Sequence, residues 1–146
     1  MKRTFLLLAA VCLLLSACSH SPKRGDAFDG VIANEEHGIT MAAENPSAGG
    51  VTLAILRTAE AELYSGNAAV YSLQQEADGV WYVLERQREL VTTAEAVGYP
   101  RDETVRQELS WGSDYGSLPA GHYRVVKSFW SEEEDLFLLA AEFTLT

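Results

Sequence analysis

The chain has 146 residues, which is enough for one domain, and its 21 acidic and 11 basic residues give a formal net charge of −10. Phosphate groups repel a surface of this sign, so the composition argues against nucleic acid and against a domain that lies flat on anionic lipid. The two cysteines, Cys12 and Cys18, both lie near the start, so no disulfide framework is expected in the rest of the chain.

The first 17 residues have the pattern of a secretory signal peptide. Lys2 and Arg3 give it a positive start, and residues 5–15 form a short apolar run. A run of about a dozen apolar residues is too short to span a bilayer as a helix, which needs about 20. We therefore expect residues 1–17 to be removed, together with Cys12.

The tetrapeptide Leu15-Ser16-Ala17-Cys18 resembles the bacterial lipobox. The resemblance implies cleavage before Cys18, attachment of diacylglycerol to its thiol, and a lipid anchor on the extracytoplasmic face of the cell membrane. An ordinary signal peptide followed by an incidental cysteine is the alternative. Removal of the leader takes away two basic residues and no acidic one, so the formal charge changes from −10 to −12.

Residues 18–36 carry a proline, two glycines and scattered charge without a sustained period, and we interpret them as a tether. A flexible chain of this length spans about 25 Å, from about 5–6 Å × √n, which clears the lipid headgroups. Phe28, Val31 and Ile32 are the apolar residues of this segment that could dock on the domain. The folded domain itself is expected to cover residues 37–146.

Alternating apolar residues then predict a series of strands separated by turns, without intervening helices. Val51, Leu53 and Ile55 show the clearest period of two, and Asp78-Gly79 supplies the residues that a tight hairpin turn needs. Residues 58–67 are interpreted as a short connection rather than a helix. The seven expected strands cover residues 37–43, 51–57, 69–73, 80–84, 103–111, 124–130 and 136–145.

The segment that leads into the sixth strand resembles the tyrosine corner of immunoglobulin-like and fibronectin-like sandwiches, in which a phenol bonds back to the main chain. Its corner residues are Leu118, Gly121 and Tyr123. Together with this corner, residues 79–82, 111–116 and 141–144 resemble the bacterial immunoglobulin-like domains of Firmicutes lipoproteins. The resemblance covers about residues 39–146. It implies an all-β fold, an immunoglobulin-like β-sandwich, and an extracytoplasmic module with no catalytic residue.

Val125 stands where antibody-type domains carry the second cysteine of their inter-sheet disulfide. Because the chain lacks that bridge, apolar packing of Val125 against Leu53 or Ile55 would have to replace it. The sandwich is therefore expected to depend on its apolar core alone.

The sequence contains no recognisable catalytic or metal-binding pattern. It has no Gly-x-Ser-x-Gly turn, and lipidation would consume the thiol of Cys18. His37 has no second histidine at helical spacing, and His122 lies in the corner motif, so both are interpreted as surface or edge residues. We expect no catalytic residue, no metal and no cofactor.

Four adjacent carboxylates, Glu132, Glu133, Glu134 and Asp135, form the predicted loop of the C-terminal hairpin. They could ligate Ca²⁺, but neighbouring residues of a strand point to opposite faces and the Asp-x-Asp-x-Asp-Gly loop is missing. The favoured interpretation is a solvated tip that discourages association between sheet edges.

Of the three tryptophans, Trp81 and Trp111 are predicted to lie in the core. Trp130 precedes the acidic run and is either an exposed binding anchor or a packing residue under the sheet edge. As an anchor, it would form with Glu132–Asp135 a site for a basic protein partner or a cell-envelope component. A non-catalytic interaction or structural module is the favoured hypothesis, with an accessory inhibitor or sensor, or a small envelope hydrolase, as alternatives.

Overall fold

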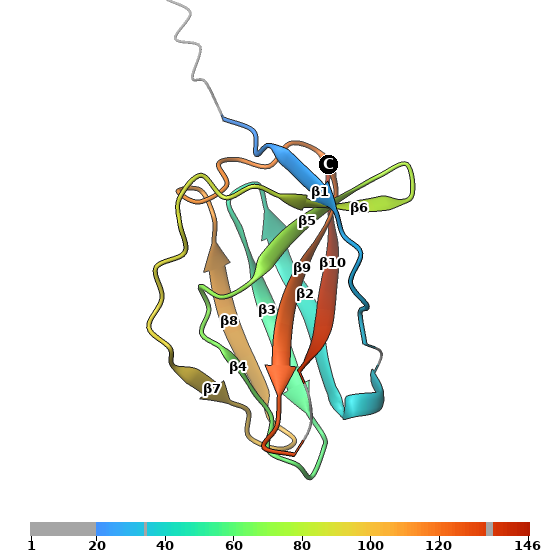
Figure 1. Cartoon of the computed structure of the whole chain (residues 1–146), viewed down its shortest axis with the longest axis vertical. Helices are drawn as coiled ribbons and strands as arrows, with labels where there is room; N and C mark the ends of the chain where they lie inside the picture. The colour runs from blue at the N-terminus through green and yellow to red at the C-terminus, as the bar shows by residue number, and fades with distance from the viewer. Residues whose placement is uncertain (1–19, 34, 134–135) are drawn as a thin grey trace, which may run out of the picture.

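Two antiparallel β-sheets, packed face to face, make up the folded part of the chain (Figure 1). The computed structural model describes residues 20–33, 35–133 and 136–146. Within these ranges, no helix is long and apolar enough to cross a membrane. The elements are β1 (Arg24–Ala27), η1 (Glu35–His37), β2 (Ile39–Ser47), β3 (Gly50–Arg57), β4 (Tyr64–Gly66), β5 (Ser72–Ala77), β6 (Val80–Leu84), β7 (Ala96–Gly98), β8 (Thr104–Ser110), β9 (Gly121–Trp130) and β10 (Phe137–Leu145).

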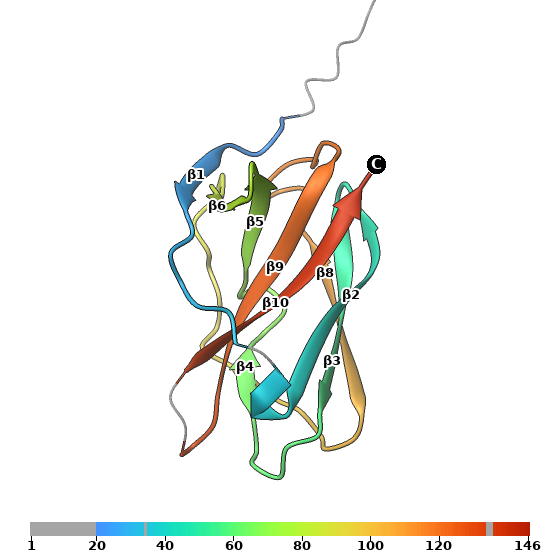
Figure 2. The ribbon, with the colours of Figure 1, turned by 90° about the vertical axis from the view of Figure 1, so that its right-hand side faces the viewer.

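The smaller sheet has the strand order β2-β3-β8, and the larger sheet has the order β1-β6-β5-β9-β4-β7 with β10 paired to β9. Figure 2 shows the two layers side by side. β10 runs antiparallel to β9, with Phe137 opposite Phe129 at one end and Leu145 opposite Gly121 at the other. The predicted all-β, immunoglobulin-like sandwich is thereby confirmed.

The core lies between the sheets and follows the alternation of the sequence. Val51, Leu53 and Ile55 of β3 are 4%, 0% and 0% exposed, whereas the residues between them are half-buried. Val125 of β9 is also fully buried, in the same apolar cluster as Leu53 and Ile55. Apolar packing therefore occupies the place where an inter-sheet disulfide would lie, and its burial contributes about 25 cal/mol per Å² of apolar surface.

Asp78 and Gly79 form the tight turn between β5 and β6. Their φ angles are +52° and +79°, the left-handed region that both central residues of a type I′ turn require. Glycine and aspartate tolerate this region better than most residues, so the predicted hairpin is found at the predicted position.

The corner residues pack as one unit at the start of β9. The Tyr123 hydroxyl donates a hydrogen bond of 2.7 Å to the Pro119 carbonyl, four residues back, as in a tyrosine corner. The ring is fully buried and stacks on Phe143, with 5.7 Å between ring centroids. A Cβ at Gly121 would lie only 3.2 Å from the Tyr123 ring, and Leu118 is buried beside the core. The close approach explains why glycine occupies position 121.

We expect Tyr123→Phe to lower the free energy of unfolding by about 1–3 kcal/mol, because it leaves the Pro119 carbonyl without its donor. Urea unfolding, with the midpoint and m-value fitted together, measures this change. Tyr71→Phe is the matched control, because the Tyr71 hydroxyl is buried without a hydrogen-bond partner within the described structure. An equal loss of stability in both variants would contradict a specific role for the corner bond.

The segment interpreted as a tether is partly built into the domain. Docking of its apolar residues was left open by the sequence, whereas the strand within it was not predicted. β1 pairs with β6, and Ile32 forms a parallel bridge with Leu138 of β10. Phe28 covers the guanidinium of Arg124 at 5.1 Å, whereas Val31 is 83% exposed. β1 is short and mostly exposed, and it is held by main-chain pairing, so it leaves no apolar period in the sequence.

The tryptophans divide differently from the prediction. Trp111 is fully buried, as expected, but Trp81 is only half-buried and was wrongly assigned to the core. Trp81 faces outward from β6 and lies against the Arg124 guanidinium at 4.2 Å. Apolar and aromatic residues occupy both faces of β6, so the sequence alone did not show which face packs on the core and which lies against Arg124.

Lys127 interrupts the apolar face of β9, and it is only 1% exposed. Its ammonium group donates to the main-chain carbonyls of Gly66, Asn67 and Val70, at 3.3, 2.9 and 2.8 Å. Burial lowers the pKa of Lys127 to about 8. The lysine thus ties β9 to the connection between β4 and β5 through main-chain acceptors.

Candidate interaction site at the hairpin end

Three loops gather at one end of the sandwich, which we call the hairpin end. They are the connection of β9 to β10, of which residues 131–133 and 136 are described, that of β3 to β4 (58–63) and that of β7 to β8 (99–103). Figures 1 and 2 show them opposite the end where residue 20 enters the domain. Loops fixed on a rigid scaffold are the usual place for binding residues, so this end is the candidate site.

Trp130 lies at the end of β9, where it pairs in register with Tyr64 of β4. Both side chains are half-buried, while the neighbouring Phe129 points into the core and is fully buried. Two large aromatic side chains from different strands are thus partly open to solvent at the edge of the hairpin end. Such residues supply apolar contact area to a partner.

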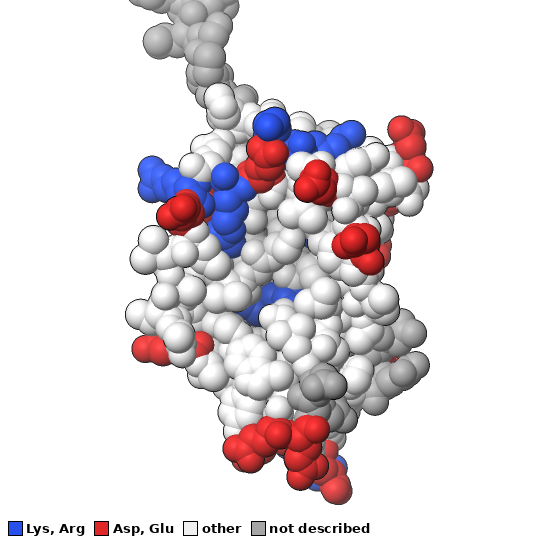
Figure 3. All heavy atoms as spheres, viewed as in Figure 1, with Lys and Arg blue, Asp and Glu red and all other residues white. Residues whose placement is uncertain are grey.

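Carboxylates surround these aromatic residues, and Figure 3 shows the acidic side chains gathered at this end. Glu132 and Glu133 are exposed, as are Glu60 and Glu62 in the loop between β3 and β4. Glu134 and Asp135, which were predicted to belong to the same tip, lie outside the described residues. A hollow of about 300 Å³ lies between the two loops, lined by Ala61, Glu62, Ser131, Glu132 and Glu133.

The Tyr64 hydroxyl is linked to this acidic group. It donates a hydrogen bond of 2.7 Å to Glu62. That bond is the largest cause of the raised pKa of Tyr64. Burial and the charges of Glu62 and Glu132 raise this pKa further. Glu62 and Glu132 therefore act on one phenol from two different loops, which joins the hairpin tip to the loop between β3 and β4.

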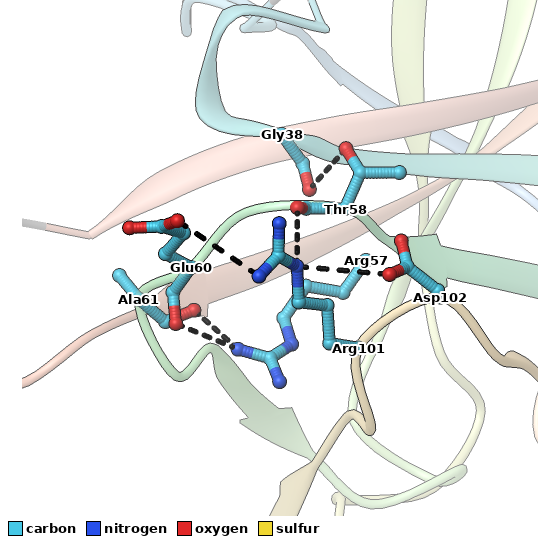
Figure 4. A network of polar contacts seen from close by, with 7 residues as sticks. All are labelled: Gly38, Arg57, Thr58, Glu60, Ala61, Arg101 and Asp102. Atoms are coloured by element: carbon cyan, nitrogen blue, oxygen red, sulfur yellow. Dashed lines mark hydrogen bonds and ion pairs between the residues drawn. The ribbon is translucent and has the colours of Figure 1, made fainter.

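Two arginines lie beside the acidic group (Figure 4). Arg57, the last residue of β3, forms a parallel bridge with Arg101, and the amide of Asp102 donates to the Arg57 carbonyl at 2.8 Å. Arg101 is exposed and donates to the Thr58 carbonyl at 3.2 Å. Its guanidinium also lies 3.9 Å from Glu60 and 3.7 Å from Asp102. Surface pairs of this kind contribute little to stability, so the main effect of Arg101 is to offset part of the negative charge of Glu60 and Asp102.

The remaining candidate residues of the sequence do not meet at this site. His122 lies on the outer face of the larger sheet, where its two ring nitrogens face Glu76 and Glu142. His37 stacks on Phe137 at 3.9 Å. Within the described part of the chain, no three histidine, cysteine or acidic side chains form a metal-binding group. The histidines are therefore parts of packing and surface networks.

Sequence reasoning missed Arg57 and Tyr64 as parts of the site. Tyr64 lies in a strand of three residues, too short to give a period, and Arg57 ends a strand that is otherwise clearly apolar. One signal was available for Arg57. It continues the alternation of Val51, Leu53 and Ile55, so its position predicted a buried charge.

The two sheets, the tyrosine corner and the clustered end loops define an immunoglobulin-like β-sandwich. A family model described as bacterial Ig-like domain matches residues 34–144, which is most of the chain, and the chain belongs to this family. No curated protein and no solved structure matches it significantly. Membership of this family favours a structural or interaction module.

Proposed function

We propose that the chain is a lipoprotein anchored through Cys18 to the extracytoplasmic face of the cell membrane, where its domain captures a basic protein partner at the hairpin end. The arrangement of the ends carries this proposal. The domain begins close after Cys18, at the end of the sandwich opposite the hairpin end (Figure 2). An anchor at Cys18 leaves the acidic and aromatic residues directed away from the membrane.

Charge supports a basic partner. The exposed Glu60, Glu62, Glu132 and Glu133 lie in the loops next to the strands that carry Trp130 and Tyr64, and the Tyr64 hydroxyl donates to Glu62. Rim charges of this kind steer a partner of opposite sign and raise its association rate at low salt. Aromatic side chains at the centre of a contact supply most of its affinity. The site therefore suits a protein segment rich in lysine or arginine.

We expect Cys18→Ala to abolish membrane anchoring, because the thiol that carries the diacylglycerol is lost. In detergent phase partitioning, the variant should appear in the aqueous phase instead of the detergent phase, or it should accumulate as an uncleaved precursor. Cys12→Ala is the matched control, because this cysteine lies in the predicted leader and its change should leave partitioning unaltered. Normal partitioning of the Cys18 variant would exclude lipidation.

We expect Trp130→Ala to weaken capture of the partner from crosslinked membranes by about tenfold or more, as for a hot-spot residue. Neutralising Glu132 and Glu133 should mainly slow association and reduce its dependence on salt. Trp81→Ala is the control, because Trp81 is also half-buried but lies on β6, outside the hairpin end. A Trp130 variant that captures the same partners equally well, or melts much earlier, would contradict the proposal.

A further inference from the structure

Arg57 is a buried cation without a carboxylate partner in the described structure. Its residue is only 7% exposed, and its Nη1 donates to the main-chain carbonyls of Ala61 at 2.5 Å and Glu60 at 3.4 Å (Figure 4). Among the residues that the structure describes, none accepts a hydrogen bond from Nε, and no acidic oxygen lies within 4.0 Å of the guanidinium. Two carboxylates of the same network, Glu60 and Asp102, face the neighbouring Arg101 (Figure 4).

Such an arrangement leaves a charge that the protein only partly compensates. Removal of a guanidinium from water is costly unless an anion and further hydrogen bonds replace its hydration. Carbonyl oxygens supply two of the acceptors here, and no negative charge among the described residues pairs with the cation. An anion that reached Arg57 would find an unopposed charge and unused donors.

Arg57 also lines a pocket of about 330 Å³, so that an anion from outside has a place to bind. Apart from Arg57 and Glu62, the pocket is lined by apolar and aromatic residues and by main chain: Leu63, Tyr64, Gly98, Tyr99 and Pro100. Largely apolar walls with a small number of charged groups, here Arg57 and Glu62, are typical of a site that orients a small polar group. The Tyr99 hydroxyl is directed to Ser65 at 2.6 Å and accepts from Gln107 at 3.1 Å, so it is already engaged.

Glu62 joins this pocket to the acidic hollow, because it lines both of them. One cation therefore lies next to a group of carboxylates that includes Glu132 and Glu133. A ligand that fits both regions must carry a negative group beside positive ones. A highly charged anion such as a phosphate would be repelled by the surrounding acids, whereas a single carboxylate matches a guanidinium in shape and charge.

We propose that the Arg57 pocket binds the C-terminal carboxylate of a basic peptide, and that the adjacent acidic hollow binds the lysine or arginine side chains that precede it. This inference rests on the proposed function, since it names the part of the basic partner that the hairpin end recognises. It adds a direction to the contact, because every chain ends in one carboxylate, which can directly follow basic residues.

The test compares two acetylated hexapeptides of identical lysine-rich sequence, one with a free C-terminal carboxylate and one with a C-terminal amide. Calorimetric titration of the purified full chain should show the acid form binding at least about tenfold more tightly, because a charge-assisted bond to Arg57 is lost in the amide. Arg57→Met should remove that difference while the lysine-dependent binding stays.

Arg101→Gln is the matched control, because Arg101 is exposed and already faces Glu60 and Asp102; this variant should keep the preference for the acid form. Equal binding of the acid and the amide by the unaltered chain would overturn the inference and leave capture of basic partners intact. Failure of both peptides to bind would overturn the inference together with the proposed docking at the hairpin end. If Arg57→Met unfolds, the peptide pair on the unaltered chain still decides.

Discussion

Trp111→Ala is expected to lower the free energy of unfolding by about 3–5 kcal/mol, which is the range for removal of a large buried aromatic side chain. Trp111 follows β8 and is fully buried. Its indole Nε1 donates to the Ala48 carbonyl at 2.8 Å, and its ring stacks on Phe143 with 5.8 Å between centroids. The substitution therefore opens a cavity between the sheets and leaves a carbonyl without its donor.

Trp81→Ala is the matched control and should cost only about 1–2 kcal/mol, because Trp81 is half-buried and lies against the Arg124 guanidinium at 4.2 Å and the His122 ring at 5.1 Å. Thermal unfolding and urea unfolding of both variants measure the difference. Equal losses would mean that the position of Trp111 between the sheets does not decide its contribution to stability.

Where one face of a strand is buried, the sequence was sufficient to predict the strand. Val51, Leu53 and Ile55 alternate because β3 packs one face on the core, and β10 alternates for the same reason. Asp78-Gly79 was recognisable because few residues accept the backbone of a type I′ turn. The tyrosine corner was recognisable because its residues lie close together in sequence, and the close approach of the Tyr123 ring favours glycine at position 121.

Elements held by main-chain pairing alone could not be predicted. β4 and β7 have three residues each, and the exposed β1 has four, so none of them shows a period. Among the described residues the structure has ten strands where about seven were expected, and the additional ones are these short segments. Their burial depends on neighbours that are distant in sequence, which no local pattern records.

The candidate site divides in the same way. Trp130 and the acidic run are adjacent in sequence, so their proximity was evident. Arg57 and Tyr64 reach the same end from other strands: Tyr64 pairs with Trp130, and Arg57 forms a bridge with Arg101. Sequence reasoning thus found the part of the site that one loop supplies.

Lys127 is the charged residue that interrupted the apolar pattern of β9, and its burial predicts a dependence of stability on pH. Burial lowers its pKa to about 8 in the folded chain, from an ordinary value of 10.5. Between these two values the unfolded chain binds a proton that the folded chain does not. The free energy of unfolding therefore rises with pH across this window, and the gain is lost as the pH falls to 8.

The expected rise is about 2 kcal/mol between pH 7.5 and 9.5, from about 1.4 kcal/mol per pH unit across the part of the window that lies in this range. Urea unfolding at several pH values should show this slope in the unaltered chain and not in Lys127→Met. The loss of three main-chain hydrogen bonds also lowers the stability of that variant, but this loss does not depend on pH. The comparison of slopes therefore isolates the ammonium group.

Buried phenols limit the range of the measurement. Burial raises the pKa of Tyr71 to about 12. The stability that the neutral phenol of Tyr71 contributes is therefore complete below pH 10 and is lost only at higher pH. Because both proteins contain the same tyrosines, ionisation of the phenols cancels in the difference between them. Equal slopes for the unaltered chain and Lys127→Met would show that the lysine stays charged throughout, stabilised by the carbonyls of Gly66, Asn67 and Val70 strongly enough to offset its burial.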